Sequence, residues 1–409
     1  MKVISLMIDR TNERVTDKSI IQTSMIVGLI LNGNFIVNTI SHFVKISSLY
    51  AVYMISLGMI CLLVNKSVPI ISNKKVFLCV IVIFLQFFFS IWEIGNIRTN
   101  HFFQCFIAIG LPCCLIGMNN FEEMIACKTV IVSSLVCAAN YYYINTGTYN
   151  VYNSGEQMGL AYSLLPPIMV SIIVLLGTDN KKWRIVSIFT ILLSVFSLFK
   201  LMTRGAYICL LAFIFFVVAL NIKTWLKRKT SIIGVMLGIS LIMFLMLRYP
   251  IYESAWYHHV FGLKSENILN GREIDIEALK EWRGMWKSFW GSGIGSYKAN
   301  TGNDYIHNIF GQVYYEQGIY SAFFLLLIII SSIKSIIKRQ VNNRLLLALI
   351  AVSVLRLQMS YYYWIDATFW LFIGVSMSQS DRIKALNNAE REIDEKRKLS
   401  AGFNSINNI

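Results

Sequence analysis

The stretch VFLCVIVIFLQFFFSIW, residues 76–92, decides the fold class of this chain, and IVSIFTILLSVFSLFKL at 185–201 has the same character. Each run is close to the roughly 20 apolar residues that an α-helix needs to cross the hydrocarbon core of a bilayer. Similar runs recur from one end of the chain to the other. The sequence therefore predicts an all-α polytopic membrane protein.

The overall composition supports this class. Hydrophobic residues make up 56% of the 409 residues and charged residues 14%, against roughly 45–50% and about 25% in soluble domains. The net charge of +15 would suit a nucleic-acid partner. However, the Lys and Arg residues lie mainly between the apolar runs, where anionic lipid head groups attract them. Membrane lipids are thus the expected partners, and nucleic acid is not.

The apolar runs predict about twelve transmembrane helices with one long periplasmic loop that carries an amphipathic helix. The expected spans are residues 20–40, 48–64, 76–95, 101–118, 124–144, 157–176, 185–202, 205–221, 231–249, 306–330, 344–358 and 366–378. The eight cysteines lie in or beside these runs without metal or paired-loop spacing, and we interpret them as small packing residues.

The charge distribution predicts the orientation. Most of the 37 Lys and Arg residues lie in the N-terminal leader, in alternate short loops and in the C-terminal tail, and cytoplasmic segments carry such an excess. Both termini are therefore expected to be cytoplasmic. Charges such as Asp9 and Arg10, ahead of the first apolar run, argue against a signal peptide.

Four parts of the chain follow from this topology. They are an N-terminal membrane bundle of about nine spans at 1–249, a periplasmic loop at 250–305, about three C-terminal membrane helices at 306–378, and a cytoplasmic tail at 379–409. The absence of an internal repeat, or of a Gly/Pro-interrupted helix pair at matching places in two halves, disfavours a transporter built from inverted repeats.

The outer loop contains the features that suggest chemistry. From Glu273 to Trp290, aromatic and basic residues form neighbouring stripes at helical spacing, which predicts a helix lying flat on the outer interface. The acidic residues near its start, Asp275 among them, suit the helix dipole. The turn Gly291–Gly295 follows; its amides could approach a phosphate, but a simple reversal into the next helix fits better.

That next helix is expected to begin near His307. The spacing of His307, Gly311, Tyr314 and Gly318 predicts that they share one helix face. An imidazole ordinarily titrates near neutrality, so it can take a proton from a hydroxyl. An interfacial hydrogen-bonding role is the plainer alternative.

Four arginines are candidate anion ligands. Arg204 stands in a very short outer connection, Arg272 and Arg283 lie in the outer loop, and Arg356 lies within a predicted span. Guanidinium groups suit phosphate oxygens, whereas snorkelling or packing roles are the plainer alternatives for Arg204 and Arg356. No cluster has metal-ligand spacing and no nucleotide-binding loop is recognisable, so no metal and no cofactor is expected.

The order of these motifs resembles the O-antigen ligase and polymerase superfamily, in particular the Wzy-type O-antigen polymerases. The motifs are Arg-Gly-Ala at 204–206, Gly-Arg at 271–272, a Trp-rich helix, Gly-x-Gly-x-Gly at 291–295 and His-Asn at 307–308, and the likeness covers about 201–320. The Arg-x-x-x-Leu pattern of these proteins is not met at Arg204, where Ile208 stands in place of leucine.

The resemblance implies a metal-independent, inverting glycosyl transfer at the periplasmic face of a bacterial inner (plasma) membrane, from an undecaprenyl-pyrophosphate-linked oligosaccharide. It implies that His307 activates the acceptor hydroxyl and that Arg204, Arg272 and Arg283 bind the pyrophosphate, with a chain-length regulator as a further partner. Polymerisation of repeat units is favoured over two alternatives. One is an O-antigen ligase that transfers the chain to the lipid A core, and the other is a flippase for lipid-linked oligosaccharides.

Overall fold

The structure of the chain is a computed structural model. It describes residues 18–44, 49–64, 74–93, 106–146, 154–201, 203–226, 275, 277, 279, 285–303, 305–339, 344–359 and 362–378. Within these residues every regular element is a helix and no strand occurs, which confirms the all-α class.

The helices follow one another along the chain as short and long segments. They are Lys18–Leu31, α2 (Gly33–Ser41), α3 (Leu49–Val64), α4 (Lys74–Glu93), the π-helical turn η1 (Phe106–Gly110), α6 (Leu111–Met118), α7 (Glu123–Val136), α8 (Ala138–Thr146), α9 (Ser154–Ser163), α10 (Leu165–Gly177), α11 (Lys181–Leu201), α12 (Arg204–Leu226), α17 (Met285–Trp290), α18 (Ser296–Thr301), α19 (Ile309–Arg339), α20 (Arg344–Ile350), the π-helical turn η3 (Ala351–Leu355), the 3-10 turn η4 (Tyr363–Ile365) and a last helix, Ala367–Ser378.

Helices occupy every predicted span except 231–249, which lies outside the described residues. By length and hydropathy, 3 of them could cross a membrane unaided: Gln157–Gly177, Lys181–Leu201 and Ile309–Ile337. The number rises to 5 if each of two bent helix pairs counts as one span. The predicted count of twelve spans is therefore not established by the described part of the chain and stays a prediction.

The two bent pairs correct the expectation of straight helices at 20–40 and 124–144. Lys18–Leu31 meets α2 at 63°, and α7 meets α8 at 53°. The breaks fall at Asn32 and Cys137. The Asn32 amide donates to the Ser133 hydroxyl at 2.8 Å, so the two bent helices are joined near their breaks. Neighbouring helices and polar side chains can stabilise such breaks in an apolar setting.

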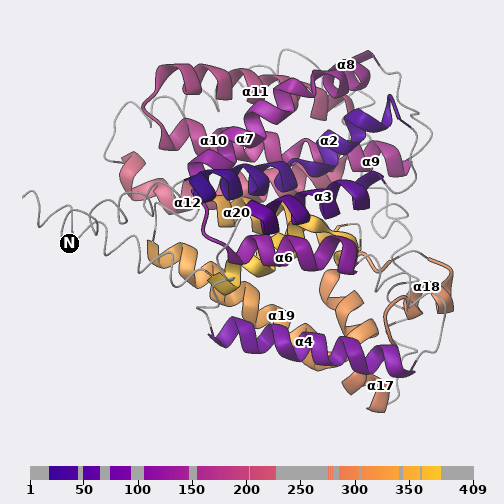
Figure 1. The fold of residues 1–409 in the computed structure, drawn as a ribbon. Helices are drawn as coiled ribbons and strands as arrows, with labels where there is room; N and C mark the ends of the chain where they lie inside the picture. The colour runs from indigo at the N-terminus through magenta and orange to yellow at the C-terminus, as the bar shows by residue number, and fades with distance from the viewer. Residues whose placement is uncertain are drawn as a thin grey trace, which may run out of the picture.

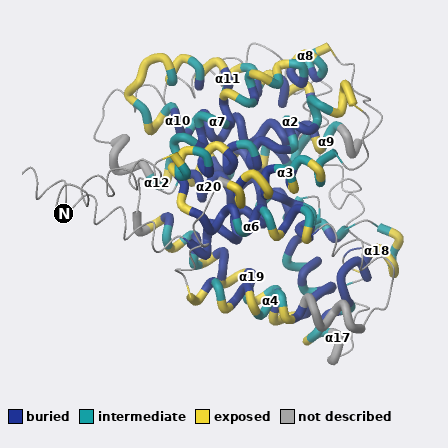
Figure 2. The backbone as a smooth tube through the Cα atoms, in the orientation of Figure 1, coloured by how far each residue is buried: buried dark blue, intermediate teal, exposed yellow. Residues whose placement is uncertain are grey.

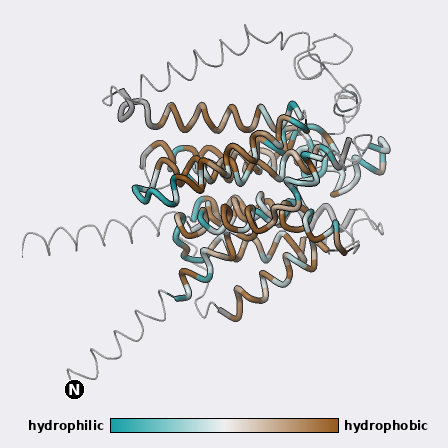
Figure 3. Tube along the Cα trace, turned by 90° about the horizontal axis from the view of Figure 1, so that it is seen from above, coloured by the Kyte–Doolittle hydropathy of each residue, from teal (hydrophilic) through white to brown (hydrophobic). Residues whose placement is uncertain are grey.

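The helices pack side by side in layers. In Figure 1, α11, α10 and α7 lie at one edge of the bundle and α4, α17 and α19 at the other, with α3, α6 and α20 between them. Figure 3 shows hydrophobic residues in the middle of the helices and hydrophilic ones toward their ends. This arrangement suits a bundle whose helix ends reach the two surfaces of a bilayer.

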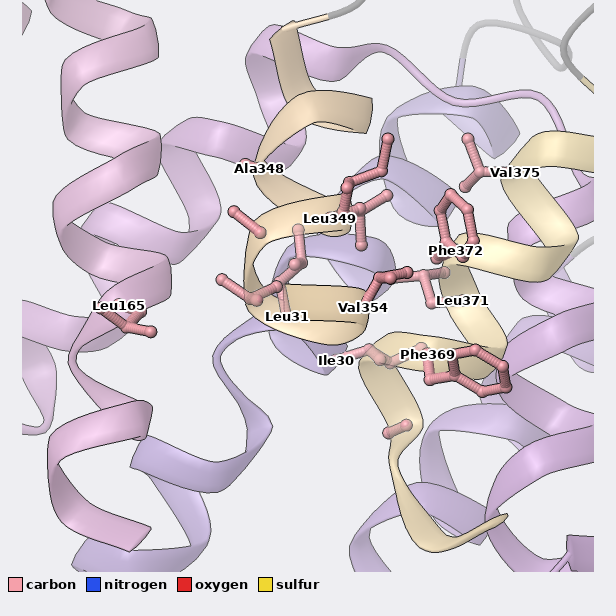
Figure 4. Close-up of a cluster of buried hydrophobic side chains, with 14 of the residues drawn as sticks. Ile30, Leu31, Leu165, Ala348, Leu349, Val354, Phe369, Leu371, Phe372 and Val375 are labelled. Atoms are coloured by element: carbon pink, nitrogen blue, oxygen red, sulfur yellow. The ribbon is translucent and has the colours of Figure 1, made fainter. Parts of the chain in front are cut away.

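The core lies where the central layers meet. Figure 4 gathers side chains from Lys18–Leu31, α20, η3 and the last helix, among them Ile30, Leu349 and Phe372. Figure 2 shows burial at the centre and exposure on the outer faces of α4 and α11. On those outer faces the exposed residues are often apolar; Leu78 of α4 is 60% exposed and Leu192 of α11 is 65% exposed. Apolar outer surfaces on this scale are expected on a protein surrounded by lipid.

Candidate functional site

His307 lies in the short segment that leads into α19, not on the helix itself. The helix begins at Ile309, and the side chain of Asn308 caps it by accepting the backbone N–H of Gly311 at 3.0 Å. At the other end of the predicted face, Gly318 has φ 83° and interrupts the helix. The expectation that His307, Gly311, Tyr314 and Gly318 share one helix face is therefore wrong.

The partner of His307 is Asp275, a residue that the sequence suggested only as a favourable charge at a helix start. Nδ1 of His307 lies 3.0 Å from Oδ2 of Asp275, and the backbone N–H of His307 donates to the same oxygen at 3.0 Å. The hydroxyl of Tyr297 donates to the other carboxylate oxygen. Asp275 is thus bonded to two segments of the chain, one through Tyr297 and the other through His307.

This contact favours one tautomer of the imidazole. A carboxylate only accepts hydrogen bonds, so Nδ1 of His307 carries the proton at this contact and Nε2 is left as the basic nitrogen. The Asp275 side chain is 7% exposed, while that of His307 is 32% exposed. A buried carboxylate behind a partly exposed histidine is the arrangement that orients a general base.

A small apolar core holds this pair in place. Tyr297, Ile306 and Tyr315 are buried together, and Leu279 and Tyr314 pack on them. Burial, with the Asp275 carboxylate as its hydrogen-bond partner, raises the pKa of Tyr297 to about 12. The tyrosine therefore remains protonated and donates to the carboxylate throughout the physiological pH range.

The glycine turn packs directly on α19. Gly291, Gly293 and Gly295 all have positive φ, and a Cβ at Gly291 would lie 2.2 Å from the Glu316 carbonyl oxygen. The N–H of Ser292 donates to the Tyr315 carbonyl and that of Gly293 to the Glu316 carbonyl, both at 2.9 Å. These amides are bonded within the protein, which favours the structural reversal over a phosphate-binding turn.

Glu316, which belongs to none of the sequence motifs, connects the glycine turn to Tyr363 of η4. Its carboxylate accepts the N–H of Gly295 at 3.0 Å and the hydroxyl of Tyr363 at 3.1 Å. The amide of Gln317 also donates to the Tyr363 hydroxyl, at 2.7 Å. Glu316 is only 1% exposed, so these bonds give a buried carboxylate the partners that it requires.

Arg356 lies buried at the end of η3. Its Nη1 is 3.3 Å from Oδ2 of Asp366, and its guanidinium lies over the ring of Tyr162 at 5.4 Å. Through its other oxygen, Asp366 accepts the backbone N–H of Phe369 at 3.0 Å and so caps the last helix. Arg356 thus has a structural partner, whatever else it binds.

Arg204 is the first residue of α12 and is partly buried. A Cβ on the next residue, Gly205, would lie 2.1 Å from the Tyr162 hydroxyl and 3.3 Å from Cβ of Met359. The backbone beside Arg204 and the guanidinium of Arg356 therefore touch the same tyrosine. Tyr162 thus lies between the backbone at Gly205 and the Arg356 guanidinium, whereas Arg272 and Arg283 lie outside the described residues.

Aromatic rings surround the histidine. The His307 imidazole is 5.1 Å from the ring of Tyr305, which in turn is 5.2 Å from that of Tyr362. Tyr362, just before η4, is thus connected to His307 through Tyr305, while Met359 lies against Gly205.

A small apolar cavity lies between α4, α19 and the last helix. Its lining is apolar apart from Gln317 and Tyr363, the two residues that bind each other next to Glu316. Among the described residues, no group of His, Cys, Asp and Glu side chains could hold a metal ion.

No protein-family model matches the chain, and no curated protein matches its sequence.

Proposed function

We propose that this chain is a membrane glycosyltransferase that joins undecaprenyl-pyrophosphate-linked oligosaccharide repeat units at the periplasmic face of a bacterial inner membrane, as an O-antigen polymerase does. The observation that carries the proposal is the 3.0 Å contact between His307 and the buried carboxylate of Asp275. A base and several cations at one end of an apolar bundle suit a lipid-linked anionic donor. The proposal includes a topology of about twelve membrane spans with both termini in the cytoplasm.

In the proposed reaction, Nε2 of His307 removes the proton from the acceptor hydroxyl. The acceptor oxygen then attacks the anomeric carbon of the donor sugar from the side opposite the pyrophosphate. As the new glycosidic bond forms, the old carbon–oxygen bond breaks and its electron pair goes to the leaving pyrophosphate. The anomeric configuration is inverted. Asp275 stabilises the imidazolium until its proton passes to solvent or to the leaving group.

The arginines carry the second part of the proposal. Negative charge grows on the leaving oxygen during transfer, and cations aimed at it stabilise the transition state. Arg204, Arg272 and Arg283 are proposed as the pyrophosphate ligands. Arg356 is proposed to contribute positive charge beside Arg204 while Asp366 holds it in place.

The apolar surroundings support a lipid-linked substrate. The outer faces of α4 and α11 expose large hydrophobic side chains, and the cavity between α4, α19 and the last helix is lined almost entirely by apolar groups. A donor with a hydrocarbon carrier can reach the site along such surfaces, and its pyrophosphate provides the driving force without a nucleotide.

The test is His307→Ala in a strain from which the gene has been deleted, with the O-chain ladder on a lipopolysaccharide gel as the measurement. We expect loss of the ladder. His42→Ala is the matched control, because His42 also lies at a helix end, bonded to Asn140 and close to the Tyr143 ring. An unchanged ladder with His307→Ala would remove the catalytic assignment.

The deletion strain itself separates polymerase from ligase. A polymerase deletion leaves one repeat unit on each lipid A core. A ligase deletion leaves none on the core, with polymer still on the lipid carrier. The first result is the expected one.

One observation favours the flippase alternative. The bends of 63° and 53° in neighbouring helices, with Asn32 and Asn140 buried near them, are features that transporters share. A deletion strain that still carries single repeats on its lipid A core has exported them, and that result argues against a flippase.

A further inference from the structure

A row of aromatic rings extends from His307 along the surface of the site. The imidazole lies 5.1 Å from the ring of Tyr305, which lies 5.2 Å from that of Tyr362. Tyr362 rests on Trp364 at 4.5 Å. The rings come from two segments that are far apart in the chain, so folding is what assembles the row.

Burial separates two members of this row from three other tyrosines of the region. Tyr297, Tyr315 and Tyr363 are 0%, 4% and 3% exposed, as packing residues are. Tyr305 and Tyr362 are only partly buried, like His307 beside them. Trp364 is buried and supports Tyr362 from below. Part of the Tyr305 and Tyr362 rings therefore remains accessible next to the proposed base.

Such rings suit one class of ligand well. An aromatic face carries negative charge density and attracts the polarised C–H groups on one face of a sugar ring. Tyrosine also offers a large rigid contact at low entropic cost. The rings of Tyr305 and Tyr362 meet at 78°, so each presents a face of its own.

We propose that Tyr305 and Tyr362 form a stacking platform for pyranose rings of the saccharide substrate. This inference rests on the proposed function and names the contacts that hold its sugar. A sugar stacked on Tyr305 presents its hydroxyl to Nε2 of His307. Tyr362, whose ring lies 5.2 Å from that of Tyr305, provides a second ring for the platform.

The competing explanation is an interfacial belt, in which tyrosines at the helix ends contact lipid head groups. Both explanations place the rings at the membrane surface, but only the platform binds sugar. Direct sugar binding therefore distinguishes them, and it does so without relying on catalysis.

The experiment uses the full chain in nanodiscs of phosphatidylethanolamine and phosphatidylglycerol. The probes are the methyl pyranosides of glucose, galactose, rhamnose and N-acetylglucosamine, and saturation-transfer NMR measures their binding. We expect transfer to the protons of one ring face for at least one glycoside, above the signal of empty nanodiscs. Tyr305→Ala and Tyr362→Ala should each reduce it by about fivefold, since each removes a stacking face.

Two further variants control for folding and for general aromatic contact. Tyr305→Leu keeps an apolar side chain of substantial size but has no aromatic face, so it should lose sugar binding while its thermal unfolding stays close to that of the wild type. Tyr320→Ala should bind as the wild type does, because Tyr320 is 44% exposed but stacks on Phe289 away from the row.

No transfer from any glycoside, or equal transfer from the wild type and Tyr305→Leu, would overturn the platform. His307→Ala separates this failure from failure of the proposed function. If it binds glycoside and loses the O-chain ladder, both proposals stand. If it binds glycoside and keeps the ladder, the platform stands and the catalytic assignment fails. If the ladder is lost while the wild type binds no glycoside, only the platform fails.

Discussion

Asp275→Asn is the perturbation that tests the proposed site most directly. In the folded chain the two carboxylate oxygens accept three hydrogen bonds, from the His307 backbone N–H, the His307 ring and the Tyr297 hydroxyl. Asparagine has nearly the same shape but one oxygen and no charge. With its oxygen toward His307 and its amide toward the Tyr297 hydroxyl, it preserves the packing and removes the charge.

The size of the effect follows from the charge that is lost. When His307 accepts a proton, the new imidazolium lies beside the carboxylate, with Nδ1 at 3.0 Å from Oδ2. Unit charges about 4 Å apart attract by ~4 kcal/mol at an effective dielectric constant of about 20. Each ~1.4 kcal/mol of transition-state stabilisation is a factor of about ten in rate. Since His307 is 32% exposed, solvent screens part of this attraction, and we expect a loss of about 10²- to 10³-fold.

The assay is the rate of polymer formation in membrane vesicles from a strain that accumulates lipid-linked repeat units, at matched amounts of protein. Glu277→Gln is the control, because Glu277 is exposed and lies two positions along from Asp275; it should retain the wild-type rate. Thermal unfolding of purified Asp275→Asn should stay close to that of the wild type. A folded Asp275→Asn protein that polymerises within about threefold of the wild type would refute the role of Asp275.

Three further predictions concern stability, each measured by thermal unfolding of the full chain in nanodiscs. Gly318→Ala should destabilise the folded chain strongly, because φ is 83° and the new Cβ would lie 2.0 Å from a carbonyl oxygen of α17. Gly159→Ala is the control; its new Cβ would meet nothing within 4 Å, so it should be neutral or stabilising. Arg356→Met should cost about 3–5 kcal/mol by leaving Asp366 buried without its cation, and adding Asp366→Asn should recover part of the loss. Because the pKa of Tyr297 is raised from 10.0 to about 12, its stabilising contribution should be complete below about pH 10 and lost as the pH rises toward 12; Tyr297→Phe should remove this pH dependence.

The residues of the candidate site that could be predicted were those that neighbouring residues in the sequence made conspicuous. His307 stood out because it follows a glycine turn at the start of an apolar run, and Arg204 because it stands in a very short connection between two such runs. Asp275 carried no comparable signal. Asp275 has the ordinary surroundings of an acid at a helix start, and its partner lies 32 positions along the chain. A carboxylate inside an apolar run is a signal that could have identified Glu316.

The sequence by itself determined the class of this protein and the positions of its helices. Helix formation depends on backbone bonds between residues four apart, and membrane affinity depends on the apolar content of about 20 consecutive residues, so both can be read locally. Only the tertiary structure decided the bends at Asn32 and Cys137, the break at Gly318 and the pairing of His307 with Asp275. Each of these depends on atoms from a distant segment, such as the α17 carbonyl that excludes a Cβ at Gly318. Local patterns of hydrophobicity do not specify which segment comes to lie there.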